Sequence, residues 1–257
     1  MQVVILCGGL GTRLHEETEF RPKPMVPIGG RPILWHIMKT YAHYGHKDFI
    51  LCLGYKGEVI KEFFRNYHWN TSDVTLRLGQ PAGVSYHGSH DEEDWTVTLL
   101  ETGLKTLTGG RLKQALAHVR EEDFLLTYGD GVTDSDINAS VAFHHRHRSL
   151  ATITAVRPPG RFGDLIVNGE NVEGFTEKPG RQAALINGGF FVINKKIQDY
   201  LGTEDCMFEQ AVLPRLTAEN RLKAFCHDGF WQCMDTYREQ MLLDKMWHDG
   251  AAPWKVW

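Results

Sequence analysis

The chain has 257 residues, 42% of them hydrophobic, and a formal net charge of -4 at pH 7. That length and hydrophobic content suit one large α/β domain with a substantial core. The slightly acidic balance gives no general electrostatic reason to bind nucleic acid or an anionic membrane, so we expect neither partner.

The N-terminal segment and the cysteines predict a cytoplasmic protein. The apolar run at residues 3–7 is far shorter than the ~20 residues that a membrane span needs, and no basic segment precedes it. The cysteines are 5 in number, and their spacing matches no metal site. We therefore expect reduced thiols, with Cys7, Cys52 and Cys226 buried because they fall inside apolar, strand-like runs.

A glycine-rich turn follows the first apolar run. A run that stops at glycine is typical of a strand that is buried on both faces and carries the chain to a ligand. Gly8, Gly9 and Gly11 allow backbone N–H groups to approach a phosphate closely. A dinucleotide-binding pattern would need a third glycine where Leu14 stands, and the Gly-Lys-Ser/Thr of a Walker A loop is absent.

Polar residues next to this turn predict a triphosphate site. Thr12 adds a hydroxyl group and Arg13 adds a cation that can bind phosphate through two hydrogen bonds. Pro22 and Pro24 flank Lys23, and we expect them to hold it in a stiff, extended segment. The ammonium group of Lys23 would then be presented to the same ligand.

Strand and helix patterns alternate along the next part of the chain. Residues 32–44 and 58–67 predict helices, and residues 48–53 predict a buried strand between them. This alternation predicts a parallel sheet. Residues 69–94 interrupt it with glycine, proline, aromatic residues and an acidic run, and we expect an excursion or a lid there.

A second glycine-rich turn follows the strand predicted at residues 96–101. Residues 107–111, Leu-Thr-Gly-Gly-Arg, open a predicted helix that runs to Val119. Helix N-termini attract anions and donate backbone hydrogen bonds, so this turn is a candidate contact for a nucleotide. The alternative is an ordinary helix start capped by Thr108.

Two aspartates stand where predicted strands end. The strand at residues 123–128 ends in a Gly-Asp-Gly turn centred on Asp130, and the glycines leave room for a divalent metal and a phosphate. Asp235 follows a predicted strand that begins at Gly229 and precedes the last helix. The alternatives are an ordinary turn at Asp130 and a helix N-cap at Asp235.

From residue 150 the pattern changes to short strands, predicted at residues 151–156, 164–167 and 172–176. Glu177 and Lys178 come next and are followed by proline, which stiffens the lysine. Its ammonium suits a sugar phosphate, and the carboxylate suits sugar hydroxyl groups. Asn187 and Gly188 precede another apolar strand, although an Asn-Gly pair by itself is also a hairpin signal.

Three segments together resemble the signature of the sugar-1-phosphate nucleotidyltransferases. They are Cys-Gly-Gly-Leu-Gly-Thr-Arg-Leu at residues 7–14, Pro-Lys-Pro-Met-Val-Pro-Ile-Gly-Gly at residues 22–30 and Pro-Ile-Leu-Trp-His-Ile-Met at residues 32–38. Within that family the likeness is to the bacterial glucose-1-phosphate cytidylyltransferases. It extends over nearly the full chain.

The resemblance implies a fold and a reaction. The fold would be one nucleotidyltransferase domain over residues 1–257, an α/β structure with a Rossmann-like, mixed and mostly parallel sheet and helices on both faces. Residues 1–149 would mainly bind the nucleotide, and residues 150–257 the sugar phosphate. The implied reaction transfers CMP from CTP to α-D-glucose 1-phosphate, giving pyrophosphate and CDP-glucose for CDP-deoxysugar and lipopolysaccharide O-antigen biosynthesis.

The resemblance also implies roles for single residues. Arg13 and Lys23 would be catalytic, and Asp130 and Asp235 would bind Mg²⁺. The nucleotide would contact residues in and beside the two glycine-rich turns: Leu6, Cys7, Gly8, Gly9, Gly11, Thr12, Thr102, Gly103, Thr108, Gly110, Arg111 and Gly129. The sugar phosphate would contact Tyr128, Glu177, Lys178, Asn187 and Gly188.

Several alternatives remain open at this stage. A UTP- or dTTP-dependent enzyme would carry the same signature, and a non-catalytic, nucleotide-sugar-binding regulatory homologue would keep the fold. We disfavour the regulatory homologue because Arg13, Lys23, Asp130 and Asp235 are all intact. A glycosyltransferase would show an Asp-x-Asp motif, and the candidate at residues 134–136 lies at a predicted helix start, where capping explains it.

Assembly is the last expectation. The cytidylyltransferase family forms hexamers, so the resemblance implies a homo-oligomer. The aromatic excursion at residues 69–95 and the apolar tail at residues 251–257 are the features that an interface would use. The alternative for the tail is that it packs on the last helix of its own chain.

Overall fold

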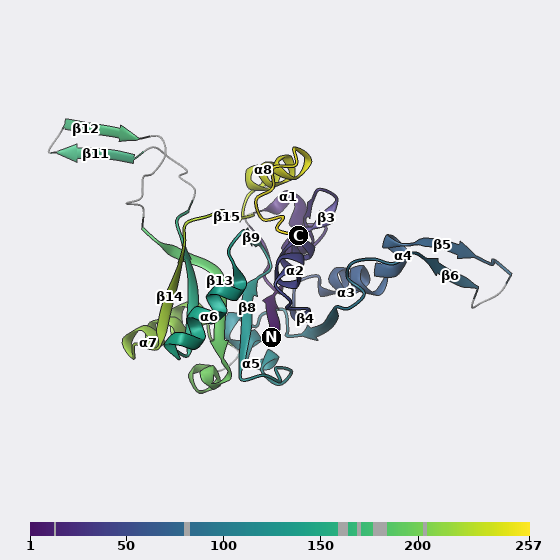
Figure 1. Ribbon diagram of the computed structural model, residues 1–257, viewed down its shortest axis with the longest axis horizontal. Helices are drawn as coiled ribbons and strands as arrows, with labels where there is room; N and C mark the ends of the chain where they lie inside the picture. The colour runs from purple at the N-terminus through teal and green to yellow at the C-terminus, as the bar shows by residue number, and fades with distance from the viewer. Residues whose placement is uncertain (13, 80–82, 159–163, 169–170, 177–183, 203–204) are drawn as a thin grey trace.

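In the part of the chain that the structure describes, helices and strands are arranged around a seven-stranded sheet (Figure 1). This computed structural model describes residues 1–257 except 13, 80–82, 159–163, 169–170, 177–183 and 203–204. The strand order is β14-β10-β13-β8-β1-β4-β7. The strands are β1 (Gln2–Leu6), β4 (Asp48–Leu53), β7 (Thr96–Glu101), β8 (Asp123–Tyr128), β10 (Ala151–Val156), β13 (Ile186–Asn194) and β14 (Leu222–His227).

The sheet is mixed and mostly parallel, as predicted. β1 is parallel to β4 and β8, β4 is parallel to β7, and β10 is parallel to β14. β13 is antiparallel to both β8 and β10. The described part of the connection from β10 to β13 holds the strand pair β11 (Asp164–Asn168) and β12 (Asn171–Thr176), whereas a parallel return would need a crossover, usually a helix.

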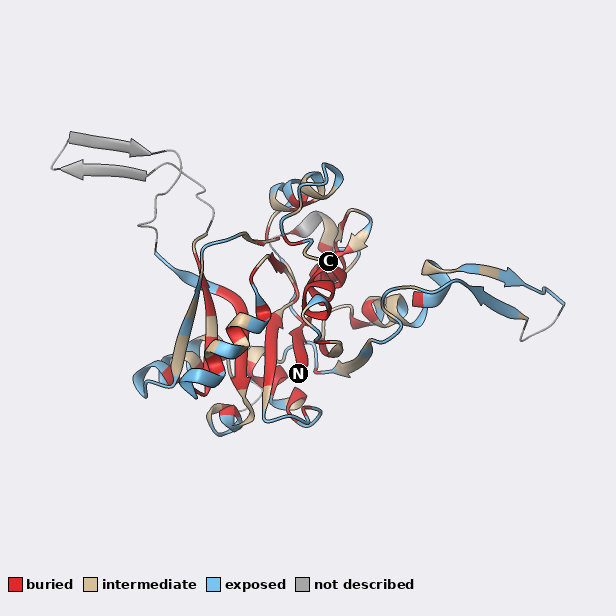
Figure 2. Cartoon of the chain, in the orientation of Figure 1, coloured by how far each residue is buried: buried red, intermediate tan, exposed pale blue. Residues whose placement is uncertain are grey.

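Helices pack on both faces of this sheet. Alternate residues of a strand point to opposite faces, so Val3 and Ile5 of β1 join one hydrophobic cluster and Val4 and Leu6 join the other. The first cluster includes residues of α2, α6 and α8, and the second includes residues of α5 and α7. Figure 2 shows the central strands between these layers as buried.

The helices have the following bounds: α1 (His15–Thr18), α2 (Ile33–His43), α3 (Gly57–Arg65), α4 (Tyr67–Thr71), α5 (Thr108–Ala115), α6 (Ile137–His147), α7 (Leu213–Ala218) and α8 (Tyr237–His248). Two 3-10 helices, which are wound more tightly than an α-helix, are η1 (Lys23–Met25) and η2 (Lys195–Tyr200). A π-helix, which is wound more widely, is η3 (Phe208–Val212). Among the described residues, no helix combines the length and the apolar character that crossing a membrane requires.

Short strand pairs lie outside the main sheet. They are β2 (Pro27–Ile28) with β3 (Arg31–Pro32), β5 (Asp73–Leu76) with β6 (Val84–His87), and β9 (Gly131–Thr133) with β15 (Trp231–Cys233). The pair β5–β6 occupies the predicted excursion and extends away from the sheet, beyond α4 (Figure 1). We call β5, β6 and the described residues between them the arm. A hairpin was not predicted there, because no Asn-Gly or Asp-Gly pair marks its turn.

The cysteines follow the prediction in part. Cys7 and Cys52 are buried and free, whereas Cys226 is free but exposed. The prediction of a buried thiol at Cys226 was therefore wrong. β14 is an edge strand of the sheet, and an apolar run on an edge strand does not reveal which of its side chains another layer covers.

The apolar C-terminal tail packs on its own chain. Trp254 is 0% exposed, and its ring stacks on Phe230 at a centroid distance of 5.6 Å and lies 6.5 Å from the ring of Trp247 in α8. The indole N–H of Trp254 donates to Nδ1 of His36 in α2 over 3.4 Å. The tail therefore follows the intramolecular alternative, and it ends beside α2 (Figure 1).

His36 links this tail to the core and predicts a pH dependence of stability. Its Nε2–H donates to the carbonyl of Ile28 over 2.8 Å, so the ring is held neutral between two partners. Burial lowers the pKa of His36 from 6.5 to about 4. Between these values the unfolded chain binds a proton that the folded chain does not, so stability is lost as the pH falls through this window.

We expect this single group to account for up to about 3 kcal/mol of unfolding free energy between pH 6.5 and pH 4. Urea unfolding at a series of pH values measures it. In His36→Gln the stability at pH 7 should be lower, because ring packing on the tryptophans is lost, and the slope across the window should be shallower. An unchanged slope would assign the pH dependence to other groups.

Candidate active site

A cavity of about 860 Å³ opens at the carboxyl ends of β1 and β8. Its described lining consists of residues 6–12, 23–24, 104–108, 111, 128–130, 187, 207 and 209. The volume lies in the range of small-molecule sites. From β1 the chain proceeds to β4 and β7 on one side, whereas β8 lies on the other side, so the cavity sits where the strand order reverses. Open α/β sheets bind ligands at such a crevice.

The glycine-rich turn after β1 is shaped by Arg111. A Cβ atom on Gly8 would lie 2.1 Å from the Arg111 guanidinium, so any larger residue would displace this buried, hydrogen-bonded group. Gly11 has φ +63, a left-handed conformation that favours glycine. A Cβ on Gly9 would meet nothing within 4 Å, so this backbone faces open space that a ligand can enter. The glycines thus serve two purposes, tight contact with the protein and access to the cavity.

Arg111 itself is 4% exposed and hydrogen-bonded to several main-chain carbonyls. Its Nη1 donates to the Leu53 carbonyl over 2.8 Å and to the Thr102 hydroxyl over 2.6 Å. Its Nη2 donates to the carbonyls of Gly8 over 3.1 Å and Leu104 over 3.4 Å. The guanidinium therefore joins the glycine-rich turn, the end of β4 and the segment after β7.

Lys23 lies at the centre of the charged part of the site. Its Nζ is 2.6 Å from Oδ2 of Asp130 and 2.6 Å from Oδ1 of Asp235. Burial disfavours the charged lysine, but the two carboxylates outweigh burial and raise its pKa above the ordinary value. Lys23 stands in the 3-10 helix η1 after Pro22, so the prediction of an extended segment was wrong. The missing N–H of Pro24 is tolerated in the first turn of a helix.

The two carboxylates are held together by backbone structure. β9, directly after Asp130, pairs antiparallel with β15, directly before Met234 and Asp235. The Met234 N–H also donates to the Asp130 carbonyl over 2.8 Å. The helix N-cap of α8 is Thr236, in a capping box with Glu239, so Asp235 is not the cap and its carboxylate contacts Lys23.

The carboxylate pair fits a hard divalent cation. Two aspartates that meet at one point supply the oxygen ligands that Mg²⁺ prefers, and Mg²⁺ commonly takes only one or two carboxylates together with substrate phosphates. Among the described residues, no group of three or more His, Cys, Asp or Glu side chains could hold a metal. Cys233 lies 3.7 Å from Asp235, but burial and that carboxylate raise its pKa to about 12, so it remains a thiol.

Glu209 is a site residue that the sequence did not reveal. It lines the cavity from the π-helix η3, accepts from the hydroxyl of Thr108 over 2.7 Å and accepts from the hydroxyl of Tyr128. Burial and Glu209 raise the pKa of Tyr128, so its phenol remains a donor. Nothing in the sequence indicated the wider turn of η3, although π-turns are frequent at functional sites.

Most of the predicted contacts line this cavity. Those that do are Leu6, Cys7, Gly8, Gly9, Gly11, Thr12, Lys23, Thr108, Arg111, Tyr128, Gly129, Asp130 and Asn187. The described lining does not include Thr102, Gly103, Gly110 or Gly188. It does not include Asp235 either, but Asp235 forms an ion pair with Lys23, which lines the cavity. Arg13, Glu177 and Lys178 lie outside the described residues.

The predicted sugar contacts at Asn187 and Gly188 have partners within the protein. Oδ1 of Asn187 accepts from the Gly189 N–H over 2.7 Å, and the Gly188 carbonyl accepts from the indole N–H of Trp231 over 2.7 Å. The Trp231 bond joins the start of β13 to β15, whereas the Asn187 bond lies within β13. The alternative hairpin at this Asn-Gly pair is not formed, since both residues belong to the long strand β13.

A mostly parallel sheet, a glycine-rich turn at its switch point and a lysine between two carboxylates define a nucleotide-binding α/β protein equipped to handle phosphates. The chain belongs to the nucleotidyl transferase family, whose sequence profile matches residues 2–249.

Two curated relatives are similar in sequence to this protein over the full length of the chain. The glucose-1-phosphate cytidylyltransferase of Salmonella typhimurium is 51% identical over 258 residues, covering 100% of both chains. A Bacillus subtilis protein named "Probable glucose-1-phosphate cytidylyltransferase" is 44% identical, again covering 100% of both. The solved UDP-glucose pyrophosphorylase of Acinetobacter baumannii has the same fold, with a TM-score of 0.69 at 20% identity over 98% of this chain and 95% of its own.

The contacts of Arg111 predict a positioning effect on nucleotide binding. Arg111→Lys keeps the charge but loses the forked donor, so carbonyls of the glycine-rich turn lose their partner. We expect nucleoside triphosphate affinity to fall roughly tenfold or more and the free energy of unfolding to fall by about 1 to 3 kcal/mol. Calorimetric titration and urea unfolding measure the two effects. Lys113→Met, an exposed change on the same helix, should alter neither, and wild-type affinity in Arg111→Lys would contradict the assignment.

Proposed function

We propose that this protein transfers CMP from CTP to α-D-glucose 1-phosphate, which gives CDP-glucose and pyrophosphate. The observation that carries the proposal is the cluster of Lys23, Asp130 and Asp235 beside a cavity at the switch point of the sheet. The choice of CTP and glucose 1-phosphate is supported by the printed activity of the relative that is 51% identical over its full length.

For this reaction the protein has mainly to position the two substrates and to neutralise the charge on their phosphates. A phosphomonoester has a second pKa near 6, so glucose 1-phosphate is largely a dianion at pH 7 and attacks without a general base. One of its oxygens forms a bond to the α-phosphorus of CTP, and the bond from that phosphorus to pyrophosphate breaks. Lys23 is suited to hold the phosphates in line because its ammonium adjoins the cavity.

Asp130 and Asp235 would hold Mg²⁺, which when bound neutralises charge on the phosphates during the transfer. The proposed nucleotide contacts are those predicted along the glycine-rich turn and around Thr108, with Arg111 acting mainly through the backbone that it holds. Arg13 as a second catalytic cation, and Glu177 and Lys178 as sugar-phosphate contacts, remain predictions.

The cellular setting is part of the proposal. All 5 cysteines are free, which suits a reducing compartment such as the cytoplasm. CDP-glucose would then serve CDP-deoxysugar and O-antigen biosynthesis, an assignment that rests on the resemblance alone.

Pyrophosphate release tests the reaction, with each nucleoside triphosphate assayed against a panel of sugar 1-phosphates. We expect CTP with glucose 1-phosphate to give the highest kcat/KM, roughly tenfold or more above any other pair. Asp130→Asn should remove the metal-dependent turnover. A preference for UTP or dTTP would assign another base, and tight binding of a nucleotide sugar without any turnover would indicate a regulatory homologue.

We also propose that the protein self-associates, through the arm of one copy and a groove on another. The arm exposes apolar side chains, among them Leu76 at 46%, Leu78 at 94%, Val84 at 42% and Tyr86 at 49%. Apolar residues left in water at a protruding hairpin favour association.

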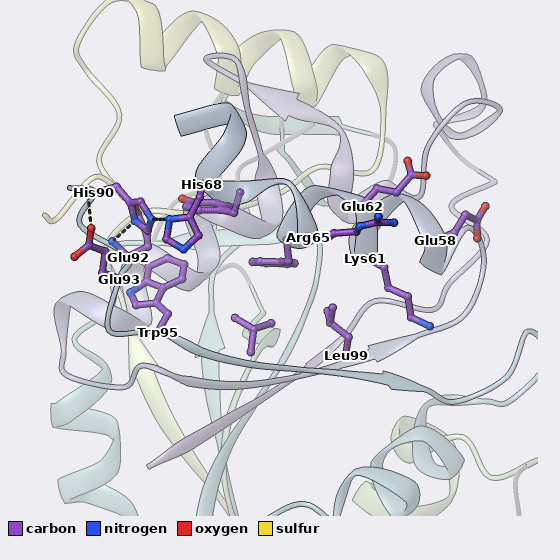
Figure 3. Close-up of a pocket in the computed structure, with 13 residues that line it drawn as sticks. Glu58, Lys61, Glu62, Arg65, His68, His90, Glu92, Glu93, Trp95 and Leu99 are labelled. Atoms are coloured by element: carbon purple, nitrogen blue, oxygen red, sulfur yellow. Dashed lines mark hydrogen bonds and ion pairs between the residues drawn. The ribbon is translucent and has the colours of Figure 1, made fainter. Parts of the chain in front are cut away.

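The groove lies between α3, α4 and β7 and has a volume of about 700 Å³ (Figure 3). Leu99 comes from β7 and Trp95 from the segment just before it, and Lys61 and Glu62 come from α3 (Figure 3). Its apolar base suits the apolar arm of a second copy, and its charged rim carries both signs. An arm and a groove on each copy make a head-to-tail contact, and such contacts form a ring if the rotation between copies closes, as the hexamer implied by the resemblance would require.

A single charge on the arm tests this assembly. Val84→Asp should lower the particle mass measured by light scattering, because a carboxylate would enter an apolar groove. Leu242→Asp on α8 is the matched control, since both side chains are 42% exposed, and it should keep the wild-type mass. A monomeric wild-type protein, or an unchanged mass in Val84→Asp, would refute the proposed contact.

A further inference from the structure

The carboxylates of Asp130 and Asp235 share one ammonium, although the three residues come from distant parts of the chain. Both N–O distances to Lys23 are 2.6 Å. The side chains of Lys23 and Asp235 are 11% and 12% exposed, and that of Asp130 is 30% exposed. Water therefore screens these charges only in part, and each carboxylate strongly favours a nearby cation.

The carboxylates cannot easily move apart to relieve their repulsion. The ladder between β9 and β15 and the bond from the Met234 N–H to the Asp130 carbonyl fix the two backbones side by side. The two fixed carboxylates therefore repel each other unless a cation lies between them. Either the ammonium of Lys23 or a divalent cation can supply this positive charge.

Lys23 differs from the carboxylates in how its charge is tethered. Its backbone is fixed in η1, but its ammonium is carried by a flexible four-carbon stem. It also lines the cavity, where the phosphates of the proposed nucleotide would offer a second anionic partner. The ammonium can thus leave the carboxylates for a phosphate without any change in the backbone.

We propose that Lys23 and the divalent cation compete for Asp130 and Asp235, so that the protein binds the cation weakly by itself and takes it up together with a nucleoside triphosphate. This inference rests on the proposed function, which supplies the nucleotide. The phosphates draw Lys23 away, and the cation replaces it on the carboxylates. The carboxylates therefore always have a cation beside them, and cation uptake becomes coupled to substrate binding.

Mn²⁺ titration without nucleotide tests this competition, followed by electron paramagnetic resonance of the free ion. The wild-type protein should bind Mn²⁺ weakly at this site, and Lys23→Met should bind it roughly tenfold more tightly or better. Asp235→Asn in the Lys23→Met background should cancel the gain. Lys47→Met removes an exposed ammonium from a single carboxylate, Asp94, and should change nothing.

Thermal unfolding gives a second measurement in case Lys23→Met folds poorly without a cation. Because a ligand that binds only the folded state stabilises it, Mn²⁺ should raise the Tm of Lys23→Met and of Lys23→Gln much more than that of the wild type. Tight Mn²⁺ binding by the wild-type protein without nucleotide would overturn the proposal. So would equal Mn²⁺ affinity in the wild type and both lysine variants.

These measurements are independent of catalysis. Failure of the pyrophosphate assay with every substrate pair would refute the proposed function but would leave the competition for the carboxylates decided by the Mn²⁺ data. A catalytically active protein with equal Mn²⁺ affinities would refute only the competition. CTP added to the wild-type titration should increase Mn²⁺ affinity at Asp130 and Asp235, and Asp235→Asn should abolish that site.

Discussion

The pair of ion pairs at Lys23 is the constraint around which the site is organised. It joins η1 near the N-terminus to the end of β8 and to the segment before α8, which are separated by 107 and 212 residues. Removing one partner from such a buried cluster would leave an uncompensated charge. In the proposed function the same two carboxylates would also hold the metal, so one cluster would serve both stability and chemistry.

Arg111 provides the complementary rigid part of the site. It is even more buried than Lys23, but it bonds to carbonyl groups and a hydroxyl, while Lys23 bonds to carboxylates. The carbonyl acceptors of Arg111 belong to the backbone, so the guanidinium is held in a fixed position. The ammonium of Lys23 is on a flexible side chain and can move from one anion to another. Arg111 thus holds the walls of the cavity, and in the proposed function Lys23 would be available for the phosphates of the substrate.

Much of this protein could be predicted from its sequence. Mainly apolar runs that end at glycine identified β1 and β8, because strands buried on both faces carry such runs. The glycine-rich turn at Gly8, Lys23 and the turn at Asp130 were each predicted to serve a phosphate ligand, and the structure brings them to one cavity. The motifs of the resemblance also identified the family, because their spacing follows from the turn and phosphate-binding geometry that they encode.

Other features were decided only by the tertiary structure. Local patterns carry no information on contacts between distant residues, so the sequence could not show that Lys23 contacts Asp235, that Arg111 fills the space beside Gly8, or that Glu209 reaches Tyr128 and Thr108. The same reason explains the exposed Cys226 and the antiparallel β13. Chemical character along the chain determined the elements and the types of group at the site, whereas the packing of segments determined which groups meet.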